Sequence, residues 1–482
     1  MSAENLPDAA GDFPADETDT VGTPQESFGD LGRRGELPAT QRGVALELAM
    51  RIGDLLQSSG QSANDSVVIM RRVCHAYGLR RVQVDITSTA IVATYYPGGG
   101  AAPITAMRTV SPAAPDLTKT MTLNRLVGDI VRGEPLSQAT DRFDAIRSAP
   151  PPYPVWVATL GNSGIGMAVQ LLYTTNPVVL VLALVTGLAL NRLLNFLSAR
   201  SMPVFFQQLA GGWLIVIVTA LTSWAGTWGW TSLFHGLDPT LIAVGGIVQL
   251  VAGMKFVAAG QDAIDGFYVT ATARLLQVLM LTAGIVAGLV SGLSVAAKLH
   301  VFVYISPNPI PMGWPVEQYA GVVLAGIFFV VGGFAGWRTI LLTGAGAALA
   351  WFGYTASAAA LGGTVTANFV GAVLAAFVTT MLVRRTAIPG FAVVNGALLG
   401  LVPGMRLYRG LIQMSGTNLT PAAPALGATA LLVAAGVALA IAAGASLGMY
   451  LGRPVGDRVM RLPHSWYGQL RRRSKTGAQS AS

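Results

Sequence analysis

Charged residues are scarce in this sequence, at 11% of 482 residues, whereas a typical soluble domain carries about a quarter. The scarcity is uneven, because residues 155–482 hold 17 Lys and Arg but only five Asp and Glu, while residues 1–154 hold 14 and 18. Excess positive charge between long apolar stretches is typical of membrane proteins. A nucleic-acid-binding protein would instead gather its basic residues on a polar domain. The sequence therefore predicts a membrane protein with no nucleic-acid partner.

Cysteine is nearly absent as well. The single Cys74 excludes a disulfide framework and a cysteine-based metal cluster, and the four histidines are scattered without metal-ligand spacing. No phosphate-binding loop follows a predicted strand, which argues against an ATP-driven pump. The first 30 residues hold eight acids and no Lys or Arg, so a signal peptide is not expected. We therefore expect no metal, no cofactor and no enzymatic activity.

Polar sequence is concentrated in the first third of the chain. Residues 1–40 are rich in Asp, Glu, Gly and Pro, and we expect them to be a disordered acidic tail. Residues 41–148 alternate between helical and strand periodicity, which predicts a small soluble α+β cytoplasmic domain. The proline-rich residues 149–154 predict a stiff linker. The domain is expected to have helices near 41–57, 63–77, 119–132 and 136–147, and strands near 82–86, 91–95 and 104–110.

Long apolar runs occupy the rest of the chain. A membrane-spanning helix needs about 20 mostly apolar residues, and we expect ten, at 155–173, 177–197, 204–224, 240–259, 275–297, 319–337, 339–358, 364–383, 387–403 and 423–450. If the soluble domain is cytoplasmic, 14 Lys and Arg fall in inside loops and the tail and three fall outside. The sequence therefore predicts a mainly α-helical polytopic protein of the plasma membrane with both termini in the cytoplasm.

Two short segments indicate an internal repeat. Residues 260–266 and 404–410 both read Gly-x-charge-x-x-charge-Gly, 144 residues apart. Five helices per repeat would invert the second half relative to the first, as in many secondary transporters, whose sites lie where broken helices meet. Chance similarity between glycine-rich loops is the alternative. The predicted segments are a first five-helix repeat at 155–297, an external loop at 298–318, a second five-helix repeat at 319–451 and a basic cytoplasmic tail at 452–482.

The charged residues of these two segments are the candidates for chemistry. Asp262 and Asp265 are spaced to share a helix face, and they would exchange protons if a cavity drew them in. The alternative is that both are solvated loop residues. Arg406 and Arg409 run against the positive-inside bias, so we expect them either to pair with the two acids or to hold a substrate carboxylate. Tolerated exposure on the outer surface is the alternative for this pair.

Helix-breaking residues flank a further polar candidate, Asn395. It lies between Pro389-Gly390 and Pro403-Gly404, whose breaks would free backbone groups to bind a zwitterion. Hydrogen bonding between helices is the alternative for this amide and for the others in apolar runs. The remaining helix-break or backbone positions are expected at Gly260, Gly266 and Gly410.

Several of these segments together resemble the threonine/serine exporters of the ThrE type. The similar segments are residues 45–60, 76–79 and 82–84 for the N-terminal domain, 261–266 with 273–274 for the first membrane half, and 402–405 with 408–410 for the second. The resemblance spans roughly residues 41–450. It implies a ten-span carrier that exports threonine and serine, driven by the proton motive force. It also marks Arg274 as a motif position, and we expect this residue to serve substrate binding or gating.

The main hypothesis is a secondary transporter that exports threonine or serine. Freed backbone amides or Arg406 and Arg409 would hold the substrate carboxylate, while Asp262 or Asp265 would meet its ammonium and be protonated to reset the carrier. Related split versions of the family are associated with dicarboxylate export, so a succinate-like dicarboxylate exporter is one alternative. From a different class, the soluble domain would be a membrane-anchored hydrolase or a regulatory domain. The expected partners are the small-molecule substrate, protons and the lipid bilayer.

Overall fold

The computed structural model describes residues 38–87, 89–98, 100–110, 115–227, 237–251, 253–301, 306, 310–383, 388–402, 404–414 and 423–459. The expected acidic tail (apart from its last three residues), most of the basic tail and Pro403 lie outside these residues. The described elements are α1 (Ala39–Ser58), α2 (Ala63–Ala76), β1 (Val82–Ile86), β2 (Ala90–Tyr95), β3 (Ile104–Thr109), α3 (Leu117–Arg132), α4 (Leu136–Ser148), α5 (Val155–Gln170), α6 (Pro177–Ala199), α7 (Val204–Thr227), α8 (Pro239–Leu250), α9 (Gly253–Ile264), α10 (Tyr268–Lys298), α11 (Pro315–Gly332), α12 (Trp337–Leu361), α13 (Thr364–Val383), α14 (Gly390–Leu398), η2 (Leu399–Leu401), α15 (Gly404–Met414) and α16 (Ala423–Val459).

Residues 39–148, here called the N-terminal segment, pack four helices with a three-stranded antiparallel sheet of order β1-β2-β3. The register pairs Val84 with Ala93, and Ala93 with Ala106. Local signals set the helix starts: Ser62 caps α2 by accepting from the Asp65 backbone N–H at 3.2 Å, and Asp116 caps α3 in the same way. One hydrophobic cluster from α1–α4 and the sheet forms the core.

Cys74 lies in this core on α2, and burial raises the pKa of its thiol to about 12. The thiolate is the form that attacks thiol reagents, so a neutral buried thiol is unreactive. We expect N-ethylmaleimide to leave Cys74 unlabelled at pH 7.5 in the folded protein and to label it fully after denaturation in detergent. Rapid labelling of the folded protein would show that α2 opens locally.

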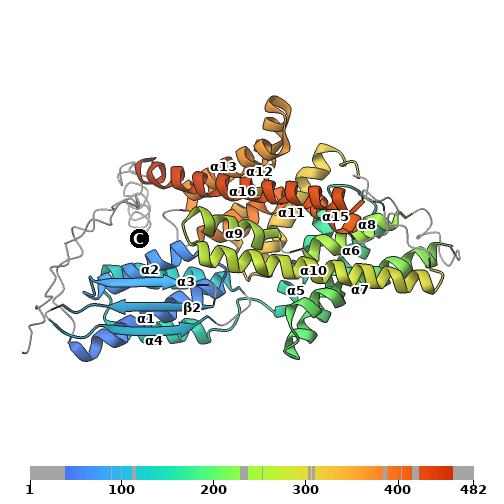
Figure 1. Ribbon diagram of the computed structural model, residues 1–482. Helices are drawn as coiled ribbons and strands as arrows, with labels where there is room; N and C mark the ends of the chain where they lie inside the picture. The colour runs from blue at the N-terminus through green and yellow to red at the C-terminus, as the bar shows by residue number, and fades with distance from the viewer. Residues whose placement is uncertain are drawn as a thin grey trace, which may run out of the picture.

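Helices α5–α16 form the helical body, which lies beside the N-terminal segment (Figure 1). Seven of its described helices, and α8 with α9 counted as one, are long and apolar enough to cross a membrane, which makes eight. The bent pair of α14 and α15 makes nine if it is one span. The ten predicted spans are therefore only partly supported. The first, 155–173, contains only the 16-residue α5, which is shorter than the roughly 20 residues that a membrane crossing needs. The chain is a mainly helical, polytopic membrane protein.

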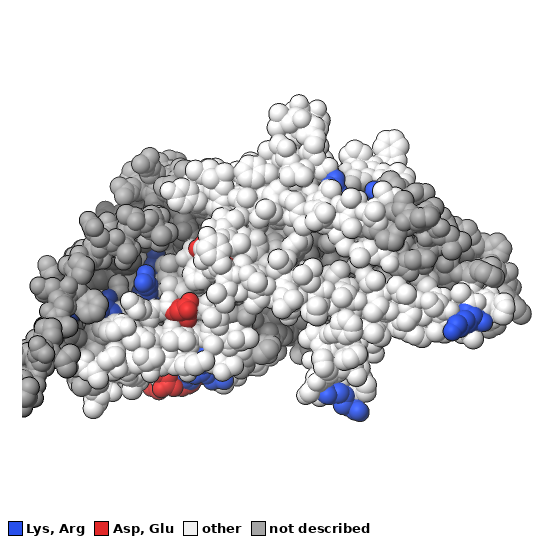
Figure 2. Space-filling model, viewed as in Figure 1, with Lys and Arg blue, Asp and Glu red and all other residues white. Residues whose placement is uncertain are grey.

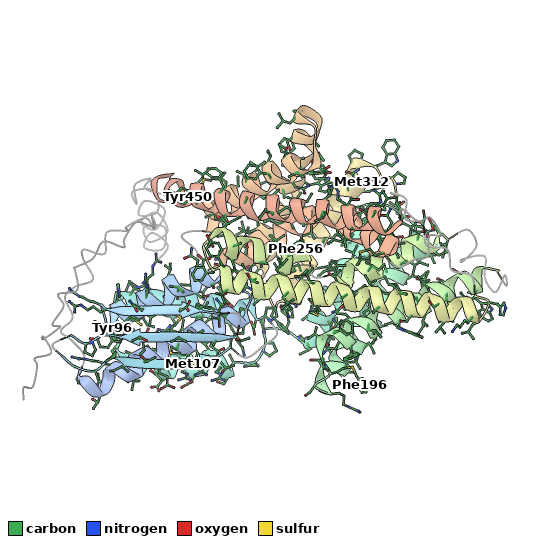
Figure 3. All side chains as sticks on the ribbon, in the orientation of Figure 1. Tyr96, Met107, Phe196, Phe256, Met312 and Tyr450 are labelled. Atoms are coloured by element: carbon green, nitrogen blue, oxygen red, sulfur yellow. The ribbon has the colours of Figure 1, made fainter. Side chains whose placement is uncertain are left out.

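The outer surface of the helical body is suited to lipid. Figure 2 shows only scattered Lys and Arg side chains on this face of the helical body, whereas the Asp and Glu in view lie over or next to the N-terminal segment. Phe196 of α6 and Tyr450 of α16 point away from the body (Figure 3), and both are more than half exposed. Large apolar side chains at an exposed surface indicate a nonaqueous neighbour.

Glycines bring two pairs of long helices into backbone contact. A methyl group on Gly288 of α10 would overlap the Leu209 carbonyl oxygen of α7, and one on Gly448 of α16 would lie 2.5 Å from the Val373 oxygen of α13. Small residues allow such close approach in membrane proteins, where packing rather than the hydrophobic effect holds helices together. The helix pairs α7–α10 and α13–α16 are thus built in the same way.

Two spans of the body are broken. Val251 is extended between α8 and α9, and Val402 is extended between η2 and α15, where the axis bends by 56°. The two breaks lie against each other. Gly253 of the first break faces Val402 so closely that an added methyl group would overlap its side chain, and a methyl group on Gly404 of the second break would lie 3.2 Å from Val248. The two half-helices α9 and α15 therefore begin side by side in the middle of the body.

Hydrogen bonds between described residues join the N-terminal segment to two turns of the helical body. Thr270 of α10 donates a 3.0 Å hydrogen bond to the Ile86 carbonyl, and Phe267 packs against the core of the segment. On the other side, the Leu117 N–H donates to the Gly333 carbonyl at 2.8 Å, beside the turn between α11 and α12. The segment is therefore attached both to the α9–α10 turn and to the α11–α12 turn.

Candidate functional site

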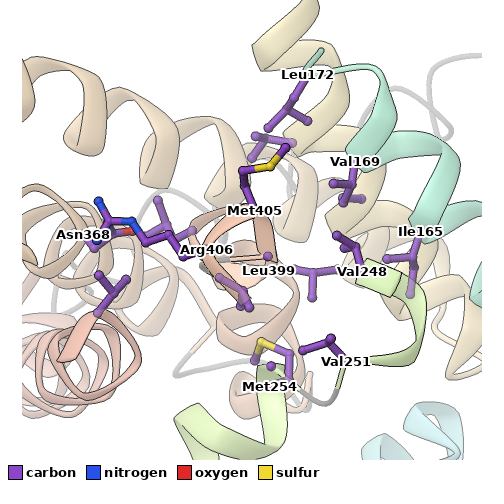
Figure 4. Close-up of a pocket in the computed structure, with 18 of the residues that line it drawn as sticks. Ile165, Val169, Leu172, Val248, Val251, Met254, Asn368, Leu399, Met405 and Arg406 are labelled. Atoms are coloured by element: carbon purple, nitrogen blue, oxygen red, sulfur yellow. The ribbon is translucent and has the colours of Figure 1, made fainter. Parts of the chain in front are cut away.

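A cavity of about 430 Å³ lies where the two broken spans cross. Its walls come from both parts of the helical body, since α5, α8 and α9 meet α11, α12, α13, η2, α15 and α16 around it. Figure 4 shows Val251 and Met254 from one break and Met405 and Arg406 from the other around the same space. We call this space the central cavity. A cavity at the junction of broken membrane helices is the usual position of a transporter's substrate site.

Most of the central cavity's wall is apolar, and its polar groups are few. Arg406 of α15 donates a 2.5 Å hydrogen bond to the Thr364 hydroxyl at the start of α13, and Asn368 Nδ2 donates to the Thr364 carbonyl at 2.7 Å. Lys255 of α9 lines the same space. Aromatic side chains from Tyr173, Trp351 and Tyr354 complete one wall. No Asp or Glu occurs among the described lining residues.

The half-helices add to the positive charge of the central cavity. Both α9 and α15 begin at the breaks, so their N-terminal ends, where backbone N–H groups lack helical partners, lie at the cavity. Lys255 and Arg406 are each the third residue of their half-helix. Two cations and two helix N-termini around one cavity favour an anionic group such as a carboxylate.

The sequence carries a signal for this arrangement that our sequence analysis missed. Residues 250–255 read Leu-Val-Ala-Gly-Met-Lys and residues 401–406 read Leu-Val-Pro-Gly-Met-Arg, 151 positions apart. Each segment spans one break and ends on the cation that lines the cavity. The repeat with a spacing of 144 is a different alignment, and the structure does not place its members equivalently: Gly260 lies inside α9, against Ala442, whereas Gly404 starts α15.

Asp262 lies away from the central cavity, at the junction with the N-terminal segment. Its side chain is 0% exposed, and its Oδ2 lies 2.5 Å from Arg274 Nη1 of α10, which is 18% exposed. The expected partners Arg406 and Arg409 therefore do not pair with it. Asp265 lies beyond the end of α9 and is exposed, because the helix ends at Ile264 and Gly266 turns the chain at φ +87°. The two acids consequently do not share a helix face.

Two protein-family models match successive parts of this chain. The profile described as "Putative threonine/serine exporter" matches residues 47–296, and the one described as "Threonine/Serine exporter, ThrE" matches residues 318–450. The chain belongs to the threonine/serine exporter family. The boundary between the two matched regions falls between α10 and α11, so each region contains one broken span.

Two members of the exporter family are similar along most of the chain. The "Probable threonine/serine exporter" of Mycobacterium tuberculosis is 32% identical over 445 residues, covering 88% of this chain and 82% of that protein. The "Threonine/serine exporter" of Corynebacterium glutamicum is 30% identical over 406 residues, covering 81% of each chain. No solved structure matches this family member significantly.

Other predicted site residues of this exporter-family chain have separate positions. Arg409 lines a second cavity, between α15 and α16. Asn395 is half-buried in α14 and is not among the described residues that line the central cavity. Gly410 packs against Leu431 and Gly427 of α16, so its small size serves helix contact. Pro389 caps α14 next to Gly390, and both line a small cavity beside the N-terminal segment rather than the central one.

Hydrogen bonding between helices, expected for amides in apolar helices, is seen for Gln249, whereas the hydrogen bonds of Asn195 and Asn368 lie within their own helices. Gln249 of α8 donates to the Asn162 carbonyl at 2.7 Å and accepts from the Gly166 N–H at 3.0 Å, which joins α8 to α5. Asn195 donates to Asn191 within α6. Asn368 differs, because it both holds Thr364 and lines the central cavity.

Proposed function

We propose that this protein exports small hydroxy amino acids, threonine and serine, across the plasma membrane. The names of the two relatives support this substrate class. The observation that carries the proposal is the central cavity, which the two broken spans enclose and which offers cations and aromatic side chains to a small zwitterion. Arg406 binds the carboxylate in this scheme, and the aromatic wall accommodates the ammonium through cation–π contact.

We propose ten spans arranged as an inverted 5+5 repeat. The short α5 supplies the first span, and α14, η2 and α15 together supply the ninth. Three observations support the repeat: the matching segments at 250–255 and 401–406, one broken span in each half, and the similarly packed pairs α7–α10 and α13–α16. An odd number of spans per repeat inverts the second half. The even total of ten then places both chain ends on one side of the membrane, which the excess of Lys and Arg in the inside loops makes the cytoplasm.

The domain boundaries follow from the same arrangement. We propose a cytoplasmic domain at 41–148, a linker at 149–154, membrane repeats at 155–297 and 319–451, an external loop at 298–318 and terminal tails on either side. The attachment of the N-terminal segment to the α9–α10 and α11–α12 turns supports a regulatory role for it. A segment attached to both halves resists their relative movement.

We propose that the proton gradient drives export and that Asp262 is the proton-binding group. A fully buried carboxylate paired with one arginine has two arrangements, either paired and charged or protonated and released. Because Asp262 and Lys255 belong to the same half-helix, release of the pair with Arg274 would free α9 to move at the cavity. Asp265 is exposed beyond the end of α9, so we do not expect a change in its protonation to free the helix in this way.

A dicarboxylate exporter is the second candidate function. The observation in its favour is that Lys255 and Arg406 both line the central cavity while no acid does among the described lining residues. Two cations match two carboxylates better than they match a zwitterion.

Substrate-resolved efflux distinguishes these two candidates. We expect a threonine-overproducing strain to lose internal threonine faster with the gene than without it. In everted vesicles carrying a proton gradient, transport of labelled threonine should be inhibited by serine and not by succinate. Inhibition by succinate, or transport of succinate itself, would contradict the amino-acid assignment and support the dicarboxylate one.

A further inference from the structure

A second cavity lies next to the central one. It occupies about 330 Å³ between α15 and α16 and is lined by Arg406, Arg409, Gln413, Leu426, Thr429, Ala430 and Val433. Arg406 is the residue common to this cavity and the central one among the described lining residues. Its guanidinium side chain therefore belongs to the wall between the two spaces.

The Thr364 hydroxyl holds Arg406 in this wall. The hydrogen bond between them is 2.5 Å long, and Asn368 fixes Thr364 from within α13. Thr364 follows Gly362 and Gly363, whose φ angles of +67° and +75° are readily adopted by glycine. Thus one partner of the contact is a neutral hydroxyl at the start of a helix, and the other is a permanent cation.

A substrate carboxylate would compete well with the Thr364 hydroxyl for the guanidinium group of Arg406. Guanidinium groups bind carboxylates through charge-assisted, often bidentate hydrogen bonds, which are roughly twice as strong as those to neutral acceptors. Three cations line the two cavities in succession, Lys255 in the central cavity, Arg406 in both and Arg409 in the second. Neither cavity has an Asp or Glu among its described lining residues.

We propose that the Arg406–Thr364 hydrogen bond is a substrate-operated gate between the central cavity and an exit path through the second cavity. The substrate carboxylate displaces the Thr364 hydroxyl from Arg406, passes to Arg409 and leaves between α15 and α16. This inference rests on the proposed export of a carboxylate-bearing substrate. It assigns the second cavity to the transport path and Thr364 to gating.

Thiol accessibility tests the gate without measuring transport. In a Cys74→Ser background, Met254→Cys reports on the central cavity and Thr429→Cys reports on the second. An anionic, membrane-impermeant methanethiosulfonate is applied to right-side-out and to everted vesicles in turn, with labelling after denaturation as the reference. From the side on which Thr429→Cys reacts, Met254→Cys should react slowly with Thr364 intact.

Removing the hydroxyl should open the path. Thr364→Val retains the shape of the side chain but cannot accept from Arg406, so we expect roughly tenfold or greater acceleration of Met254→Cys labelling from that side. Thr366→Val, which alters an exposed threonine of the same helix, is the matched control and should change nothing. Unchanged labelling of Thr429→Cys in each variant shows that the fold is retained.

Three results would overturn the gate. Thr429→Cys that no reagent reaches from either side would show that the second cavity faces lipid. Equal labelling of Met254→Cys with and without Thr364→Val would show that the contact does not close the path, as would fast labelling with Thr364 intact. Since these rates do not depend on which amino acid is exported, absent threonine efflux would reject the proposed function separately.

Discussion

Asp262→Asn is expected to abolish proton-driven threonine efflux, whereas Asp265→Asn is expected to leave it nearly unchanged. Asp262 is 0% exposed and paired with Arg274, and breaking a buried ion pair by removing one partner costs about 3–5 kcal/mol. Asp265 is exposed beyond the end of α9, and surface substitutions usually change stability by no more than about 0.5 kcal/mol. Efflux from energised vesicles and thermal unfolding in detergent measure both effects.

A double variant separates proton coupling from stability. Asp262→Asn with Arg274→Gln removes both charges, so no uncompensated charge stays buried and much of the lost stability should return. If Asp262 binds the driving proton, the double variant should exchange labelled threonine across the membrane in the absence of a gradient but should not respond to an imposed proton gradient. Retained gradient-driven efflux in the double variant would exclude Asp262 from coupling.

The second large effect is expected from the two cavity cations. Lys255→Met and Arg406→Gln should each raise the KM for threonine about tenfold or more, because a hydrogen bond to a charged group contributes about 1.5–3 kcal/mol. Lys255→Arg and Arg406→Lys keep the charge and should lose less. Exchange of labelled threonine in proteoliposomes gives KM and maximal rate separately.

Lys298→Met is the matched control for the cation variants, since Lys298 is an exposed cation at the end of α10 and is not among the described lining residues of either cavity. The combined variant Lys255→Met with Arg406→Gln should show no saturable transport. A normal KM in Lys255→Met would remove this residue from the substrate site and leave Arg406 as the remaining described cation in the central cavity.

The second broken span was predictable and the first was not. Pro389-Gly390 and Pro403-Gly404 are helix-breaking pairs, and α14 and α15 begin at them or directly after them. The first break, at 251–253, reads Val-Ala-Gly and has no proline, so no break was predicted within the span at 240–259. Lys255 was counted among the inside cations although it falls within that predicted span, and in the structure it lines the central cavity.

Side-chain pairing was the least predictable part of the candidate site. Asp262 has several arginines as possible partners in the sequence, and the short turn at Gly266 places Arg274 of the next helix beside it. Arg406 and Arg409 were expected to act together, but of the two Arg406 lines the central cavity, whereas Arg409 lines the second one. The Arg406–Thr364 contact joins positions 42 residues apart, a separation that helical periodicity does not address.

By itself the sequence determined which stretches of this protein are helical, which are apolar enough for a membrane, and which short segments resemble known exporters. Those properties depend on composition and periodicity over a few turns, which each stretch carries locally. Only the tertiary structure decided that the two breaks cross, that Lys255 and Arg406 line one cavity and that Asp262 is buried and paired with Arg274. Such placements depend on how whole helices pack, and a small change in helix direction moves side chains between a cavity, a helix contact and the lipid.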